Sequence, residues 1–129
     1  MFKFPSNILK AFNEADKGQL IQIGWKYKNR SRGSAIEDVP FFTSPCGKFI
    51  IKYGLLMTDC VPTFALPSKI RKADRRFRYW ILQPKADRSE SARKQAWEHF
   101  KPIAPIFFGL DIHRGNVAFF ENAPVLIDW

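Results

Sequence analysis

Three polar side chains near the C-terminal end of the sequence have types and spacing that suit a divalent metal ion. Asp111 precedes Asn116 by five residues, and Asp128 follows after two short apolar segments. These segments, 117–120 and 125–127, are separated by turn-forming residues and are expected to pair as a β-hairpin. In such a hairpin, the loop before the first strand lies close to the end of the second strand. We therefore expect the two carboxylates and the amide to converge on one small volume.

Carboxylate and amide oxygens are hard ligands, and Mg²⁺ prefers oxygen ligands while keeping other coordination positions for water and phosphate. A lysine elsewhere in the chain could hold the same phosphates by its charge. A carboxylate that orients a hydroxyl group, a metal ion that neutralises phosphates and a cation are the parts that phosphoryl transfer requires. The residue types therefore indicate Mg²⁺-dependent phosphoryl transfer.

The same segment carries a recognisable motif. Asp111, His113 and Asn116 read D-x-H-x-x-N, and the sequence finishes with Ile127-Asp128-Trp129. This pattern resembles the catalytic loop and metal-binding strand of the protein-kinase-like superfamily. It is most similar in motif to the aminoglycoside and small-molecule phosphotransferases, which typically read D-x-H-x-x-N and end I-D-W. The resemblance implies an abbreviated protein-kinase-like fold and an ATP-dependent phosphotransferase whose acceptor the sequence does not identify.

The resemblance also implies a role for each residue of this loop. Asp111 would be catalytic and orient the acceptor hydroxyl, while Asn116 and Asp128 would bind Mg²⁺. His113 and Arg114 would make secondary loop contacts. The implied cofactors are ATP and Mg²⁺.

Two further segments are similar to nucleotide-binding strands of that superfamily. The segment 48–53 resembles the strand whose lysine holds the phosphates, and Lys52 follows two apolar residues as in V-A-I-K. In that strand, Lys52 should face away from the side chains of Phe49 and Ile51. The segment 77–83 occupies the place of the strand that leads to the adenine-binding hinge. By position alone, Leu82 and Gln83 are therefore expected to bind the nucleotide.

Other features favour an alternative, a catalytically inactive pseudokinase-like binding module. No G-x-G-x-x-G loop precedes the 48–53 strand, and no Glu occurs between positions 53 and 89 to pair with Lys52. Six basic side chains lie within 69–78. This basic run could bind an acidic protein or a nucleic acid, although most such runs are simply solvated.

Composition limits the class of protein. The 129 residues suffice for one domain with a hydrophobic core, and the net charge of +9 favours anionic partners. No apolar segment approaches the roughly 20 residues of a membrane span. The N-terminal residues lack the pattern of a secretion signal, so we expect a cytoplasmic protein without a membrane partner. We expect Cys46 and Cys60 to be reduced, because their spacing fits neither a secreted framework nor a common zinc site.

The secondary-structure pattern predicts an α+β domain with a small antiparallel sheet, a helix, a catalytic-type loop and a C-terminal hairpin. We expect a single kinase-like domain over 1–129, with a sheet region at 1–85 and the helix, loop and metal hairpin at 86–129. Ser6 and Gly18 are expected to bracket the first helix, and Pro40 indicates an edge strand. The expected helices are 6–17 and 89–100, and the expected strands are 19–27, 37–43, 48–53, 77–83, 103–108 and the two strands of the hairpin.

Overall fold

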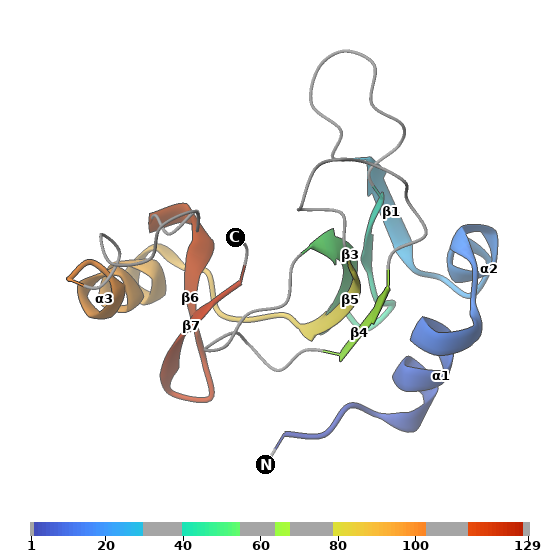
Figure 1. Ribbon diagram of the computed structural model, residues 1–129, viewed down its shortest axis with the longest axis horizontal. Coiled ribbons are helices and arrows are strands. Elements are labelled where there is room, and N and C mark those ends of the chain that lie inside the picture. The colour runs from blue at the N-terminus through green and yellow to red at the C-terminus, as the bar shows by residue number, and fades with distance from the viewer. Residues whose placement is uncertain (1, 30–39, 55–63, 68–78, 103–113, 128–129) are drawn as a thin grey trace. The chain divides into compact units, whose positions relative to one another are not determined.

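The computed structural model describes residues 2–29, 40–54, 64–67, 79–102 and 114–127 (Figure 1). Within these ranges the chain is a mixed α+β protein with small antiparallel sheets and a few helices. The broad fold class is therefore confirmed. The chain divides into two compact units, and a boundary between them falls between Lys85 and Ala86.

The first unit contains two short helices and a five-stranded antiparallel sheet with the strand order β1-β2-β3-β5-β4. Its elements are α1 (Ser6–Glu14), α2 (Lys17–Gln22), β1 (Lys26–Asn29), β2 (Pro40–Thr43), β3 (Phe49–Gly54), β4 (Phe64–Pro67) and β5 (Tyr79–Pro84).

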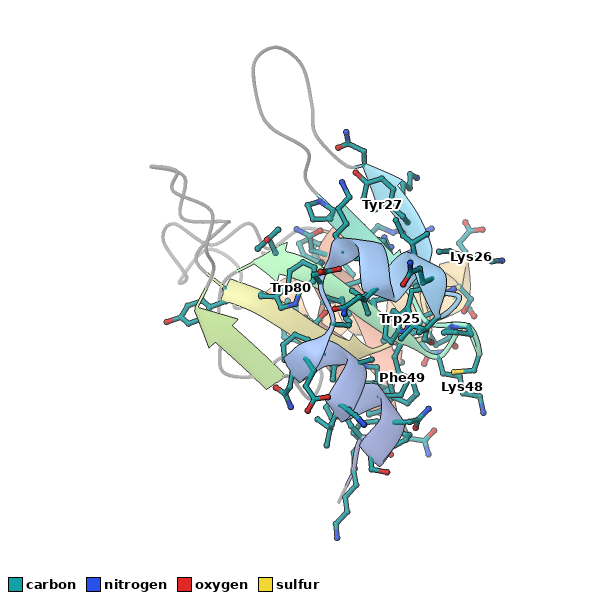
Figure 2. The ribbon with its side chains drawn as sticks, turned by 90° about the vertical axis from the view of Figure 1, so that its right-hand side faces the viewer. Trp25, Lys26, Tyr27, Lys48, Phe49 and Trp80 are labelled. Carbon is teal, nitrogen blue, oxygen red and sulfur yellow. The ribbon has the colours of Figure 1, made fainter. Side chains whose placement is uncertain are left out.

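One face of this sheet packs against the helices and forms the core of the unit. Figure 2, drawn from the helix side, labels Trp25, Phe49 and Trp80, which belong to this layer or pack against it. Phe42 lies at its centre and is fully buried. The aromatic side chains explain why two short helices suffice to form a core with this face of the sheet, since each aromatic residue buries a large apolar area. The buried members of the core are Phe4, Ile8, Phe12, Leu20, Trp25, Phe42, Phe49, Ile51 and Leu82.

The predicted strand at 19–27 is wrong over 19–25, because α2 occupies Lys17–Gln22 and no strand begins before Lys26. The Asp16 Oδ1 atom accepts a hydrogen bond from the Gln19 backbone N–H at 2.8 Å, and the Gln19 Oε1 atom accepts one from the Asp16 N–H at 2.9 Å. This reciprocal capping box starts a helix, and the burial of Leu20 anchors it to the core. The local capping chemistry therefore outweighs the partly alternating pattern, and β1 begins only at Lys26.

The first helix is also shorter than predicted. α1 ends at Glu14, and Gly18, which was expected just after the helix, lies inside α2. The residue at the N-cap position of α1 is Pro5 rather than Ser6, and it makes no side-chain cap. The packing of Ile8 and Phe12 against the sheet therefore holds this helix in place.

Replacing Asp16 by Ala is expected to lower the stability of the first unit by about 1 kcal/mol, the typical contribution of a capping side chain. Thermal denaturation followed by circular dichroism measures this loss, which amounts to a few degrees. Asp16→Asn is the matched control, because Asn caps a helix as well as Asp does and should keep the melting temperature. Equal melting temperatures for wild type and Asp16→Ala would contradict the capping role.

The strand that contains Pro40 is not an edge strand, which corrects the sequence expectation for that segment. β2 pairs with β1 on one side and with β3 on the other. Pro40 is the first residue of the strand, where the absent backbone N–H is tolerated. The turn that follows is closed by the Ser44 Oγ atom, which accepts the Phe49 N–H at 3.0 Å. Gly47 supplies the positive φ of 76° that this turn requires. Cys46 is exposed, and Cys60 lies outside the described residues.

The second unit contains one helix and a β-hairpin. Its elements are α3 (Glu90–Phe100), a 3₁₀ turn (Arg114–Asn116), β6 (Val117–Phe120) and β7 (Ala123–Leu126). The predicted helix is confirmed, including its cap, since the Ser89 Oγ atom accepts the Ala92 N–H at 3.3 Å. Its buried stripe of Ala92, Ala96 and Phe100 also agrees with the sequence pattern.

The predicted hairpin is confirmed, but its turn is shorter than expected. Glu121 and Asn122 have φ values of 50° and 63°, as the two central residues of a tight hairpin turn require. β7 therefore begins at Ala123 and includes Pro124, which pairs with Phe119. The N–H and C=O groups of Phe119 bond instead to the backbone of Asp87 on the other side of β6, at 3.0 and 2.8 Å. Because Phe119 directs these groups away from β7, the missing N–H of Pro124 leaves no hydrogen bond unmade in β6.

The described residues do not include the predicted strand at 103–108 or the basic run at 69–78. Among the helices that the structure describes, none has the length and apolar character needed to cross a membrane.

Candidate functional site

Lys52 lies near the middle of β3 and faces away from the two helices. Phe49 and Ile51 of the same strand belong to the helix-side core, so the alternation of a β-strand places Lys52 on the opposite face. Its cross-strand neighbours there are Phe41 and Ile81. The Lys52 side chain is nevertheless only 5% exposed. This position is therefore a buried setting for a lysine rather than a solvated surface site.

The two predicted hinge residues lie on opposite faces of β5. Leu82 pairs with Ile51 and packs in the helix-side core. Gln83 pairs with Ile50 and therefore shares the face of Lys52. Both side chains are fully buried. The structure thus brings Gln83 and Lys52 to one face of the sheet and places Leu82 on the other.

Asn116 stands at the open end of the β6–β7 hairpin. Its side chain is 9% exposed, and its backbone carbonyl accepts a hydrogen bond from the Ile127 N–H at 3.0 Å. The adjacent pair is Val117 with Leu126. The residue that follows Ile127 in the sequence is Asp128, the predicted partner of Asn116 in metal binding. The hairpin therefore fixes Asn116 beside the point where the chain continues to Asp128.

The structure describes only some of the remaining residues of the predicted loop. Arg114 is exposed at the start of the 3₁₀ turn, and the Gly115 carbonyl accepts a hydrogen bond from the Arg88 Nη2 atom at 3.3 Å. This bond joins the 3₁₀ turn to the segment that leads into α3. The predicted site residues outside the described part of the chain are Asp111, His113 and Asp128.

The second unit also holds a pocket of about 340 Å³ that the sequence did not indicate. Asp87 and Glu121 contribute carboxylates to its wall. The backbone N–H of Ser89 donates a hydrogen bond to the Asp87 carboxylate at 2.9 Å and lowers the pKa of that carboxyl below its usual value. The pocket is therefore polar and partly acidic in a strongly basic chain. Its lining residues are Asp87, Ala92, Gln95, Phe119, Glu121 and Asn122.

The spacing of residues in the sequence does not indicate this pocket, because its walls come from the start of α3 and from the distant turn between β6 and β7. The contact that closes it is the backbone pairing between Asp87 and Phe119, which is not visible in either segment alone. The only signal in the sequence was the cluster of polar residues around each of the two turns.

Within the described part of the chain, no group of three or more His, Cys, Asp or Glu side chains is arranged to hold a metal ion. Of the two predicted Mg²⁺ ligands, Asn116 and Asp128, only Asn116 belongs to the residues that the structure describes. Its amide oxygen has the chemistry of a Mg²⁺ ligand, and its buried position beside the hairpin gives it a fixed location.

Comparison of the chain with protein-family models, with curated proteins and with solved structures found no match.

Proposed function

We propose that this chain binds ATP with Mg²⁺ and transfers a phosphate group to an acceptor, as a kinase-like phosphotransferase. The observation that carries the proposal is the burial of Lys52 near the middle of β3, on the face of the sheet opposite the helices. Burying a lysine ammonium group costs free energy unless hydrogen-bond or charge partners compensate it. The phosphates of a bound nucleotide would add such partners, so a buried lysine at this position fits a role in phosphate binding.

The proposal assigns Lys52 to the phosphates of the nucleotide. An ammonium group in a poorly solvated position interacts with phosphate more strongly than one in bulk water, because the local dielectric constant is lower. Gln83 on the same face supplies an amide that can donate or accept a hydrogen bond. Leu82 faces the helices and lies between β3 and β4, where it pairs with Ile51 and Phe64, so the proposal gives it no direct contact with the nucleotide.

The proposal assigns Asn116 and Asp128 to Mg²⁺. The hydrogen bond from Ile127 to Asn116 supports this pairing, because it ties together the two segments that carry the proposed ligands. When bound, the ion neutralises charge on the phosphates. Asp111 would accept a hydrogen bond from the acceptor hydroxyl and orient it, with His113 and Arg114 as secondary contacts of the loop.

A second candidate function is a pseudokinase-like module that binds an acidic partner without phosphate transfer. The charge of the first unit favours it, since its described residues include eight lysines and only two carboxylates, Glu14 and Asp16. Seven of these lysines are exposed, with Lys52 as the exception. A measurement of phosphate transfer distinguishes the two candidates, whereas a measurement of nucleotide binding does not.

Thermal denaturation with and without Mg²⁺-ATP tests the proposal. Saturating nucleotide should raise the melting temperature of the wild type by several degrees, because a ligand at a hundred times its Kd stabilises by about 2.7 kcal/mol. Asp128→Ala should abolish this shift by removing a metal ligand. Glu98→Ala removes an exposed carboxylate from α3 in the same unit and should keep the shift. An unchanged wild-type melting curve at millimolar Mg²⁺-ATP would contradict nucleotide binding.

A further inference from the structure

Lys28 shares a face of the sheet with Lys52. Tyr27 packs against the helix-side core, and its ring centroid lies 5.4 Å from that of Phe42. Because neighbouring residues of a strand point to opposite faces, Lys26 and Lys28 lie on the face opposite the helices. Lys26 and Tyr27 are labelled in Figure 2.

The strand register places Lys28 and Lys52 in a single row across the sheet. Lys28 pairs with Phe41, Phe41 pairs with Lys52, and Lys52 pairs with Ile81. We call these four residues the Lys52 row. The two lysines are two strands apart, so their Cα atoms are separated by about 10 Å. Both side chains have long flexible stems, and their ammonium groups can therefore meet one extended anion between them.

Burial changes along the Lys52 row. Lys28 is exposed on the edge strand β1, Phe41 is half-buried, and Lys52 and Ile81 are buried. The row therefore leads from solvent at the sheet edge to the buried lysine. An anion with several charged groups in line fits this arrangement better than one with a single charged group.

On the sheet face that carries Lys52, the charged residues in the Lys52 row and in its neighbouring row are all lysines. The neighbouring row contains Lys26, Thr43, Ile50 and Gln83, so neither row across β1, β2, β3 and β5 contains a carboxylate. Lys26 and Lys28 are exposed on this face, and exposed lysines raise the local potential and attract anions.

We infer that Lys28 is a second phosphate-binding lysine, which contacts the same polyphosphate chain as Lys52 from the exposed end of the row. This inference rests on the proposed nucleotide binding and extends it to a residue outside the kinase-like motif. Because two separated cations favour a chain of phosphates, the contribution of Lys28 grows with the number of phosphate groups. Lys28 thus favours nucleoside triphosphates over monophosphates.

Equilibrium titrations of Mg²⁺-ATP, Mg²⁺-ADP, AMP and inorganic tripolyphosphate at one ionic strength test the inference. Lys28→Gln should weaken Mg²⁺-ATP and tripolyphosphate binding by about three- to fivefold, as expected for one exposed charge contact. The loss should be smaller for Mg²⁺-ADP and absent for AMP. Lys10→Gln removes an exposed lysine from α1 in the same unit and should leave each affinity within about twofold of wild type.

Equal affinities for the Lys28→Gln and Lys10→Gln variants would overturn the role of Lys28 while leaving nucleotide binding in place. If the wild type binds tripolyphosphate but not ATP, the proposed function fails, and the effect of Lys28→Gln on tripolyphosphate still decides the inference. If the wild type binds neither, both the function and the inference are wrong.

Discussion

Replacing Asp111 by Asn is expected to lower the rate of phosphate transfer by about 10²–10⁴-fold, the usual range for a positioned acid–base group. The carboxylate is proposed to orient the acceptor hydroxyl, whereas the metal ion and Lys52 supply most of the electrostatic stabilisation. The fold and the affinity for ATP should therefore change little. Phosphate transfer, or slow ATP hydrolysis in the absence of an acceptor, measures the effect in wild type and variant side by side.

Asp16→Asn provides a control for this loss of a carboxylate. It makes the same chemical change at a helix cap in the first unit, where Asn serves as well as Asp. Its turnover should equal that of the wild type. Equal rates for wild type and Asp111→Asn, whether at or above background, would contradict the catalytic assignment even if ATP binds. ATP binding with background rates in every variant would favour the pseudokinase-like module.

Replacing Lys52 by Met is expected to abolish the thermal shift caused by Mg²⁺-ATP while the protein remains folded. Met keeps an unbranched apolar stem between Phe41 and Ile81 but removes the charge. Because Lys52 makes other interactions within the fold, the variant also loses some stability, and the nucleotide-dependent shift is measured against the variant's own melting temperature without ligand.

Lys48→Met is the control that separates the specific role of Lys52 from a general loss of positive charge. Lys48 directly precedes β3 and is exposed in the turn before it. A variant that loses this lysine should keep the nucleotide-dependent shift. A full shift in Lys52→Met would show that the buried lysine does not hold the phosphates. A shift lost equally in both variants would point to diffuse attraction by net charge instead.

The elements with strong, unambiguous patterns were predictable from the sequence. β3 combines a run of β-favouring residues with a turn at Ser44–Gly47, and α3 combines a Ser89 cap with an apolar stripe at helical spacing. The hairpin was predictable because turn residues separate two apolar runs. In each case, local propensity, pattern and capping chemistry agree, which is the condition for a reliable prediction.

The predictions of secondary structure were wrong where two local sequence signals compete, or where the pairing between strands determines the outcome. The segment at 19–22 contains Leu20 and Ile21 and resembles a strand, but the Asp16 capping box makes it helical. Pro40 suggested an edge strand, although its position at the start of β2 lets the strand pair on both sides. The order of strands in the sheet is a property of long-range pairing, and periodicity within one segment carries no information about it.

The candidate site was predictable only in part for the same reason. Strand alternation placed Lys52 on the face opposite Phe49 and Ile51, as the structure shows. Its burial, and the shared row with Lys28, depend on pairing between β1, β2 and β3. The acidic pocket depends on the pairing of Asp87 with Phe119. A sequence pattern can therefore propose which side chains act, whereas the sheet register determines which of them share a surface.

The most direct test of the central claim is a calorimetric titration of the wild-type chain with Mg²⁺-ATP. The account predicts saturable binding of one nucleotide per chain that requires Mg²⁺ for full affinity, because Asn116 and Asp128 are proposed to act through the metal ion. The absence of saturable binding at millimolar Mg²⁺-ATP would contradict the assignment of this chain as a kinase-like phosphotransferase.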